Sequence, residues 1–193
     1  MPLPQSIGCG TGCQGIGRQA TSQGIVFPEY PMIEIRHAVH DEVHVLARVG
    51  LAAWCKGIQP LVPSATSDKI EKDNPFVPFL EDMGARVLVA VIDDRAAGIA
   101  ACEHSDDYIS DVWVAPEFEG RGVASALIGA LEREISGRGF SKARIHVAAA
   151  NTRALGLYEH LGYIEVSRET AFDPILEISL DKIGLEKHLS AQR

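Results

Sequence analysis

The hydrophobic pattern after residue 32 predicts a strand and a helix, followed by three more strands. Residues 33–36 alternate between apolar and charged side chains, as a half-buried strand does, and residues 41–54 carry apolar side chains at helical spacing. Prolines divide the chain that follows into short pieces, of which residues 67–72 are expected to be helical. Because short polar turns then separate three apolar runs, we expect three adjacent antiparallel strands. These runs are residues 86–92, 96–102 and 108–114.

The second half of the chain predicts two helices, each followed by strand structure. From residue 120 to residue 135, one apolar side chain recurs every four residues, which is a helical spacing. These side chains are Val123, Leu127, Leu131 and Ile135. A strand, a helix and two strands follow, at residues 143–148, 152–161, 163–169 and 176–180. The order of elements predicts a mixed α/β (α+β) fold with a strand–helix–strand crossover at its centre.

The first 31 residues differ in composition from the rest of the chain. Glycine, proline and small polar residues dominate them, and such a segment cannot bury enough apolar surface to fold alone. We therefore expect a flexible tail over residues 1–31 and a single folded domain over residues 32–193. The tail lacks the continuous apolar region of a signal peptide. Because a strand-like run begins at Met32, we hypothesise that the functional chain starts there.

Length and charge exclude several classes of protein. The chain has 193 residues, 46% of them apolar, and it contains no uninterrupted apolar run of about 18 residues, so no membrane-spanning segment is predicted. There are 18 basic and 26 acidic residues, which gives a net charge of -8. This charge repels phosphate backbones and anionic lipid, so neither nucleic acid nor a membrane is an expected partner.

The four cysteines indicate neither disulfides nor a metal site. Cys55 and Cys102 stand singly in apolar surroundings, and Cys9 and Cys13 lack a matching pair of histidines or cysteines. This usage fits a reducing cytoplasm best. A metal-binding protein built on Cys9, Cys13 and scattered histidines is a rival interpretation, which full activity of a metal-free preparation would dismiss.

A glycine-bearing turn between a strand and a helix is the first candidate site. Residues 112–114 belong to a buried strand, and Gly120, Arg121 and Gly122 lead into the next helix. The first N–H groups of a helix lack internal partners and its dipole is positive there, so this turn suits a phosphate group. Arg121 adds a cation at the same place.

Two other phosphate-binding motifs do not fit this turn. A Walker loop requires Gly-Lys followed by Ser or Thr, and no such triplet follows Gly122. A dinucleotide fingerprint requires glycine or alanine where Ser125 stands and an acidic residue where Lys142 is found. Neither mononucleotide transfer nor hydride transfer is therefore expected.

A second motif, NTRALGLYEHLGY, lies at residues 151–163, where a strand leads into a helix. Tyr158 stands about two helical turns beyond Asn151. Helix capping alone would explain Asn151, and core packing alone would explain Tyr158. Those structural explanations are harder to sustain for both motifs together.

Taken jointly, EGRGVA and NTRALGLYEHLGY resemble the GNAT superfamily of N-acetyltransferases, and the order of elements agrees over roughly residues 33–180. In that family the pattern Gln/Arg-x-x-Gly-x-Gly/Ala binds the pyrophosphate of acetyl-CoA, and Asn-x-x-Ala-x-x-x-Tyr closes the other side. The resemblance implies a twisted, mostly antiparallel mixed sheet of six to seven strands, with helices on both faces and a central splay for acetyl-CoA. It also implies an acyltransferase that moves an acetyl group directly from acetyl-CoA to a primary amine of a small molecule or peptide, without a metal.

The resemblance further implies which residues contact acetyl-CoA. The backbone of Val112, Trp113 and Val114 would pair with the pantetheine arm, at a splay between the strands that end at Val114 and Val147. Asn151 would hydrogen-bond the same arm. The diphosphate would be held by five consecutive residues: Arg121, Gly122, Val123, Ala124 and Ser125. The family often pairs as dimers, so the resemblance is also consistent with a homodimer.

By the same resemblance, Tyr158 is the general acid that protonates the leaving thiolate, a role open to a phenol with a pKa of about 10. A carboxylate base is expected because an alkyl amine is mostly protonated at neutral pH. Glu103, at the end of one strand, and Asp111, within the next, are both candidates. His146 is a third candidate, although a lone histidine on a strand more often has a structural role.

One position departs from the family pattern. Glu119 stands where the family has Gln or Arg, and its carboxylate near the expected diphosphate would weaken coenzyme binding. The family's phosphate contacts at this turn come mostly from main-chain N–H groups, so we expect the site to tolerate the change.

The acceptor is expected beside the helix of residues 41–54, the proline-rich segment of residues 57–79 and the loop of residues 104–107. Four carboxylates there would suit a cationic amine, although acidic residues more often only solubilise a surface. They are Glu103, Asp106, Asp107 and Asp111. Two other functions stay open: a non-catalytic acetyl-CoA-binding regulatory module, which would not need Tyr158, and an acyltransferase for a longer acyl-CoA.

Overall fold

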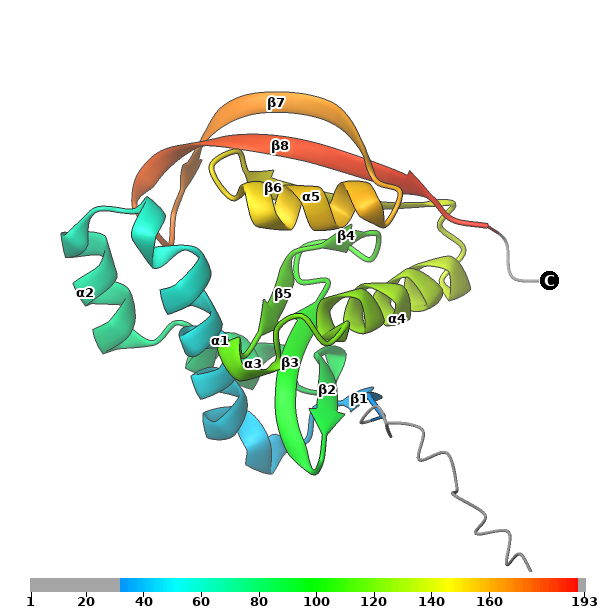
Figure 1. Cartoon of the computed structure of the whole chain (residues 1–193), viewed down its shortest axis with the longest axis horizontal. Coiled ribbons are helices and arrows are strands. Elements are labelled where there is room, and N and C mark those ends of the chain that lie inside the picture. Colours follow the sequence, from blue (N-terminus) through cyan, green and yellow to red (C-terminus); the bar gives the residue numbers. More distant parts are fainter. Residues whose placement is uncertain (1–31, 191–193) are drawn as a thin grey trace, which may run out of the picture. The chain divides into compact units, whose positions relative to one another are not determined.

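The computed structural model describes residues 32–190, which form two four-stranded sheets and five α-helices (Figure 1). The strand orders are β1-β2-β3-β5 and β4-β6-β8-β7. The strands are β1 (Glu34–His37), β2 (Leu88–Ile92), β3 (Arg95–Ala101), β4 (Tyr108–Ile109), β5 (Asp111–Val114), β6 (Lys142–Ala148), β7 (Ile164–Asp173) and β8 (Ile178–His188). The α-helices are α1 (Val43–Gly57), α2 (Ser64–Asp73), α3 (Phe76–Met83), α4 (Val123–Gly137) and α5 (Thr152–His160). The tail predicted for residues 1–31 lies outside the described residues.

The mixed α/β class predicted from the sequence is confirmed, with the strands divided between two sheets instead of one sheet of six to seven strands. In the first sheet, β2 pairs antiparallel with β1 and β3, and β3 pairs antiparallel with β5. In the second sheet, β8 pairs antiparallel with β6 and β7, while β4 pairs parallel with β6. The expectation of a mostly antiparallel mixed arrangement therefore holds.

The predicted strand of residues 108–114 is divided at Ser110, and this division separates the two sheets. The backbone N–H and the hydroxyl of Ser110 both donate to the carbonyl oxygen of Ala101, at 3.1 and 3.2 Å. Before Ser110, β4 pairs with β6, whereas after it β5 pairs with β3. β5 and β6 therefore diverge, which is the splay predicted between the strands that end at Val114 and Val147.

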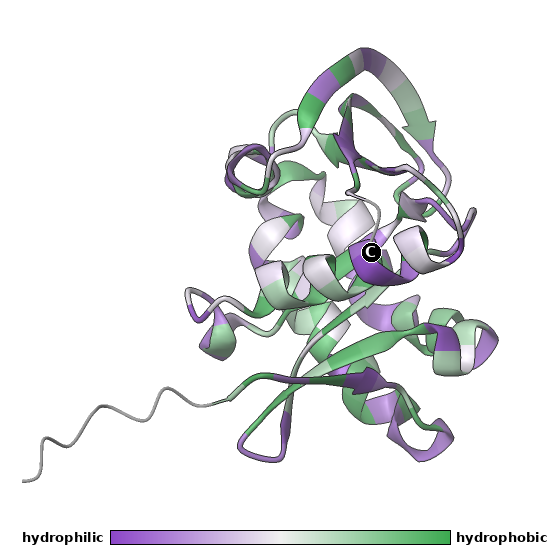
Figure 2. Ribbon diagram, turned by 90° about the vertical axis from the view of Figure 1, so that its right-hand side faces the viewer, coloured by the Kyte–Doolittle hydropathy of each residue, from purple (hydrophilic) through white to green (hydrophobic). Residues whose placement is uncertain are grey.

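α4 packs an apolar stripe on the first sheet at the spacing that the sequence predicts. The stripe consists of Val123, Leu127, Leu131 and Ile135, each no more than 1% exposed. α1 covers the opposite face and packs against α3, with Leu46, Trp54 and Leu80 buried there. Figure 2 shows hydrophobic residues gathered on long strands in the interior, and hydrophilic residues on turns and on parts of the helices. The first sheet is thus covered by helices on both faces.

Gly98 of β3 lies where α4 crosses the sheet and is a sensitive packing position. A Cβ atom there would lie 2.8 Å from the Trp113 carbonyl oxygen and 3.1 Å from the side chains of Leu127 and Val123. We expect Gly98→Ala to lower the free energy of unfolding by about 1–3 kcal/mol, because it overpacks a buried position beside backbone. Chemical denaturation measures this change.

Gly156→Ala is the matched control, because no atom lies within 4 Å of a Cβ built at Gly156 on α5. Replacing this helical glycine is expected to raise the free energy of unfolding by about 0.5–1 kcal/mol. Equal stability of the Gly98→Ala variant and the unmodified chain would show that a methyl group fits between β3 and α4 without strain.

The proline-rich stretch folds into two regular helices, whereas the sequence predicted short pieces with a helix at residues 67–72. Pro63 and Pro75 directly precede α2 and α3. A proline suits a helix start, because its φ is already near the helical value and the first N–H groups have no helical acceptor. Asn74, with a φ of 39°, ends α2 in the left-handed conformation. The prolines therefore start helices here instead of only interrupting them.

β7 and β8 form a long hairpin whose tip reaches α2 (Figure 1). Both strands are longer than predicted. The Thr66 hydroxyl of α2 donates to the Leu176 carbonyl oxygen at 3.4 Å, and Lys69 forms an ion pair with Glu177. Leu176 is buried in the same apolar cluster as Trp54 of α1. The hairpin tip thereby joins the second sheet to the helices that cover the first.

Candidate active site

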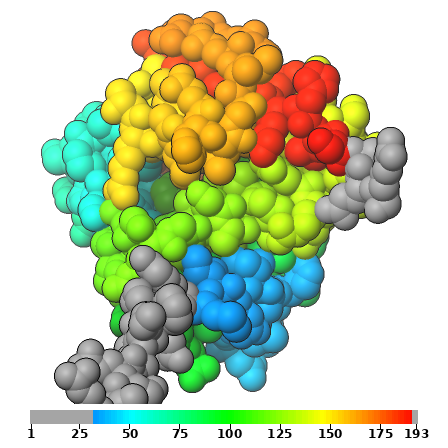
Figure 3. Space-filling model, turned by 45° about the vertical axis from the view of Figure 1, so that its right-hand side comes forward, coloured from blue at the N-terminus to red at the C-terminus, as the bar shows by residue number. Residues whose placement is uncertain are grey.

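A cavity of about 370 Å³ opens where β5 and the starts of α4 and α5 converge. Figure 3 shows the surface hollowed where the cyan, green and yellow parts of the chain meet. Except for Arg121, every residue predicted to contact acetyl-CoA lines this cavity. These residues are Val112, Trp113, Val114, Gly122, Val123, Ala124, Ser125 and Asn151. Tyr158 lines it as well, so the structure brings both sequence motifs to one place.

β5 forms one wall of the cavity and is the outer strand of the first sheet. Within residues 32–190 it pairs only with β3, so its other edge has backbone N–H and C=O groups available for an extended ligand. Trp113 Nε1 donates to Asp111 Oδ1 at 2.9 Å, and its ring packs edge-on against Phe76, with ring centres 5.2 Å apart. These contacts hold the edge strand in position.

The start of α4 presents uncapped backbone N–H groups to the cavity. Gly120 and Gly122 have φ values of 73° and 83°, a region that other residues rarely adopt. The Ala126 N–H donates to the Gly122 carbonyl oxygen at 3.0 Å, and no side chain in the described part of the chain caps the helix. The N–H groups of residues 123–125 therefore lack helical acceptors, an arrangement that, together with the helix dipole, suits an anion.

Arg121 and Asn151 are placed differently from the other predicted coenzyme ligands. Arg121 does not line the cavity, and its guanidinium carbon lies 5.4 Å from the centre of the Phe118 ring. Asn151 lines the cavity, but its Oδ1 accepts a hydrogen bond from the Ala154 N–H at 3.1 Å and caps α5. The Nδ2 group of Asn151 can still donate to a ligand.

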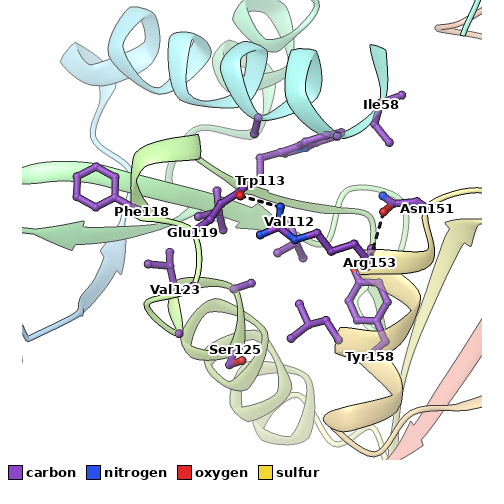
Figure 4. A pocket seen from close by; sticks show the side chains of 18 residues that line it. Ile58, Val112, Trp113, Phe118, Glu119, Val123, Ser125, Asn151, Arg153 and Tyr158 are labelled. Carbon is purple, nitrogen blue, oxygen red and sulfur yellow. Dashed lines mark hydrogen bonds and ion pairs between the residues drawn. The ribbon is translucent and has the colours of Figure 1, made fainter. Parts of the chain in front are cut away.

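Tyr158 projects from α5 at the cavity wall (Figure 4). Its side chain is buried, with 7% exposed, and its ring packs against Tyr163, with ring centres 5.9 Å apart. Burial raises the pKa of the Tyr158 phenol, and the negative charge of Asp111 raises this pKa further. The hydroxyl is therefore protonated at neutral pH, as a proton donor must be.

The structure separates the three candidate bases. Asp111 lies on β5, and its carboxylate contributes to the raised pKa of Tyr158. Glu103 lies at another cavity, of about 440 Å³, which shares no lining residue with the first. His146 Nδ1 of β6 lies 3.2 Å from the Tyr108 hydroxyl. Asp111 does not line the Tyr158 cavity itself, but of the three candidates it is the one on a strand whose other residues do.

The four carboxylates expected near the acceptor do not gather in one place. Asp106 and Asp107 line the same 440 Å³ cavity as Glu103, whereas Asp111 lies on β5. Arg144 binds both carboxylate oxygens of Asp107 at 2.8 Å, and these hydrogen bonds hold the pKa of Asp107 below its usual range. The loop of residues 104–107 is thus engaged in contacts away from the cavity that Tyr158 lines.

Glu119 forms two ion pairs that the sequence did not indicate. Its Oε2 accepts hydrogen bonds from Lys56 Nζ at 2.6 Å and from Arg153 Nη1 at 2.7 Å. Burial raises the pKa of Glu119, but the hydrogen bonds from both cations lower it to below its usual value. The carboxylate of Glu119, which stands where the family has Gln or Arg, is therefore paired with two cations. The sequence signal for this pairing was Arg153 itself. A cation in the first turn of a helix is unfavourable beside the positive end of the helix dipole, so an arginine there suggests a nearby anion.

Solved structures with a similar fold point to one class of protein. An N-acetyltransferase from Staphylococcus aureus Mu50 matches with a TM-score of 0.63 at 16% identity, covering 82% of this chain and 99% of that one. The PaiA N-acetyltransferase from Thermoplasma acidophilum, solved in complex with coenzyme A, matches at 0.63 and 15%, covering 81% and 99%. The ribosomal-protein-S18-alanine N-acetyltransferase from Escherichia coli matches at 0.62 and 19%, covering 84% and 97%. The fold is therefore that of the N-acetyltransferases.

The family model described as the Acetyltransferase (GNAT) family matches residues 52–163, more than half of the chain. The chain belongs to the GNAT acetyltransferase family and is an acyltransferase, as the two sequence motifs predicted. This family uses acetyl-CoA and acts on amine-containing acceptors in general. Among the described helices, none has both the length and the apolar character needed to cross a membrane.

Proposed function

We propose that this chain transfers the acetyl group of acetyl-CoA directly to a primary amine of a small molecule or peptide, with Tyr158 as the general acid. The supporting observation is the convergence of three features on one cavity: the edge of β5, the uncapped start of α4 and the buried phenol of Tyr158. Each feature matches one need of the reaction. The strand edge suits the pantetheine amides, the helix start suits the diphosphate, and the phenol can donate a proton.

The residues around the cavity fit acetyl-CoA, which supplies an acetyl thioester when bound. Backbone groups of Val112, Trp113 and Val114 would pair with the pantetheine arm. The N–H groups of residues 123–125 would bind the diphosphate, and Asn151 would donate to the arm from Nδ2 while its Oδ1 caps α5. Arg121 would contribute a positive charge near the diphosphate. Gly122 would leave the N–H groups of residues 123–125 accessible to it.

The reaction requires two proton transfers. Tyr158 would protonate the leaving thiolate. The amine must lose a proton before it attacks, because an alkyl amine with a pKa of about 10.4 is neutral to only about one part in 10³ at pH 7, a cost of about 4 kcal/mol. We assign this second role first to Asp111, acting directly or through water, because Asp111 begins β5, the strand that lines the cavity together with Tyr158. Glu103 is the alternative base.

A smaller cavity of about 230 Å³ is the proposed approach for the amine. It shares Ile58 with the coenzyme cavity, and its walls come from the segment after α1, the end of β6 and β8. Most of the lining is apolar, formed by Ile58, Leu61, Val62, Ala148, Ala149, Ala150 and Leu180. Asp181 supplies a carboxylate that would attract an ammonium group. Ile58, Leu61 and Val62 belong to the segment of residues 57–79, beside which the sequence predicted the acceptor, and this supports the proposed approach.

Thiol release from acetyl-CoA across a panel of primary amines tests the proposal. We expect release that depends on a particular amine and on the unmodified chain. Coenzyme binding without release for any amine would instead favour the regulatory module. Faster release from a longer acyl-CoA than from acetyl-CoA would favour the alternative acyltransferase.

The pH dependence of kcat/KM for the amine is expected to rise toward alkaline pH and to show no descending limb up to about pH 10. The rise follows deprotonation of the amine. Because burial raises the pKa of Tyr158, the phenol remains a proton donor above the pH at which an ordinary tyrosine ionises. Initial rates at saturating acetyl-CoA measure the profile. A decline that begins below about pH 9 in a chain that is still folded would argue against Tyr158 as the acid.

A further inference from the structure

We propose that Lys56 and Arg153 bind a phosphate group of the coenzyme, and that Glu119 occupies this phosphate site when no coenzyme is bound. The inference rests on the proposed function, since it requires acetyl-CoA to enter the cavity that Glu119 and Arg153 line. It adds Lys56 and Arg153 to the site as binding residues, and Glu119 as a competitor of the phosphate for them.

The two cations converge on one carboxylate oxygen from different helices; Arg153 lines the cavity, and Lys56 directly precedes Gly57, which lines it. Lys56 Nζ approaches Glu119 Oε2 from the last turn of α1, and Arg153 Nη1 approaches it from the first turn of α5. Figure 4 shows the Arg153 side chain extending across the cavity to Glu119. Phosphate oxygens accept hydrogen bonds from lysine and arginine as carboxylate oxygens do. The arrangement is therefore a ready-made site for a phosphate oxygen.

The burial of the three side chains fits an exchange of anions. The Glu119 side chain is sheltered, with 19% exposed, whereas Lys56 and Arg153 are 49% and 66% exposed. The long cationic side chains can therefore move without disturbing the core. Glu119 also lies just before α4, where the helix dipole favours a negative charge. It thus occupies a position that suits the anionic part of a ligand.

Helix stability does not explain the position of Arg153. A cation in the first turn of α5 faces the positive end of the helix dipole. The Arg153 side chain is 66% exposed, and an ion pair with such a mobile, solvated partner contributes little to folding, so its pairing with Glu119 gives a weak structural reason for an arginine here. Binding to a coenzyme phosphate gives a functional reason, because the phosphate would meet Arg153 and the start of α4 together.

Competition between Glu119 and the phosphate predicts the direction in which each substitution changes the affinity for acetyl-CoA. Glu119→Gln keeps the size of the side chain but removes its charge, so the cations are released for the ligand. We expect this variant to bind acetyl-CoA about three- to tenfold more tightly than the unmodified chain. Lys56→Met and Arg153→Met are each expected to weaken binding by about three- to tenfold, because they remove a phosphate partner.

Glu117→Gln is the matched control for the change of charge. Glu117 lies two residues before Glu119, in the short 3-10 helix Pro116–Phe118, but it pairs with Arg95 at 2.9 Å and does not line the cavity. Its removal changes the net charge of the chain by the same amount as Glu119→Gln. Acetyl-CoA affinity is therefore expected to stay within about twofold of the unmodified chain.

Calorimetric titration with acetyl-CoA measures all five proteins, and thermal unfolding checks that each variant is folded. Tighter binding by Glu119→Gln, together with weaker binding by both cation variants, is the expected result. The inference is overturned if Glu119→Gln binds no more tightly, if Glu117→Gln tightens binding equally, or if both cation variants bind normally. Absence of acetyl-CoA binding by the unmodified chain would instead refute the proposed function.

Discussion

Tyr158→Phe is expected to lower kcat by about 10²- to 10⁴-fold while the affinity for acetyl-CoA stays unchanged. The substitution removes only the hydroxyl, and the remaining ring can keep its packing against Tyr163. Without the phenol, the leaving thiolate has to take its proton from water. Steady-state thiol release measures kcat, and calorimetric titration measures binding of acetyl-CoA.

Tyr163→Phe is the matched control, because Tyr163 is another buried tyrosine beside Tyr158 but does not line the coenzyme cavity. We expect its kcat to equal that of the unmodified chain. Full turnover by Tyr158→Phe would remove Tyr158 from the mechanism. A similar loss in both variants would mean that the packing of the two rings, and not a proton transfer, limits the reaction.

Gly122→Val is expected to weaken acetyl-CoA binding at least about tenfold. Gly122 directly precedes α4 and has a φ of 83°. A β-branched residue is strained in that conformation, so the turn would rearrange and move the N–H groups of residues 123–125. Because these groups are the proposed diphosphate ligands, calorimetric titration with acetyl-CoA detects the change directly.

Gly139→Val is the control for backbone strain alone. Gly139 has a φ of 93°, lies just beyond the other end of α4 and has no atom within 4 Å of a built Cβ. We expect this variant to lose stability but to keep its affinity for acetyl-CoA. If both valine variants lost affinity to the same extent, the start of α4 would have no special part in coenzyme binding.

Elements that rest on local signals could be predicted from the sequence. α4 follows from apolar residues at every fourth position, all of which are buried in the structure. The two motifs around Gly122 and Tyr158 were also predictable, because each combines a helix start with its characteristic residues. The residues between these motifs are mostly α4 and β6, which bring both motifs to one cavity.

Features that depend on contacts between distant segments could not be predicted. The division at Ser110 depends on the Ala101 carbonyl oxygen of another strand. Lys56 lies 63 positions from Glu119, and no local pattern links the two. The position of Glu103 at a separate cavity likewise depends on where the chain turns after β3. Composition and periodicity describe single elements, whereas these contacts are set by the packing of several.

The central claim is that the backbone N–H groups at the start of α4 hold the diphosphate of acetyl-CoA and direct its thioester toward Tyr158. A crystal structure of the chain with coenzyme A tests it most directly. We expect diphosphate oxygens within about 3.2 Å of the N–H groups of residues 123–125, with the sulfur beside the Tyr158 hydroxyl. Coenzyme bound in another cavity, or with its diphosphate away from α4, would contradict the claim.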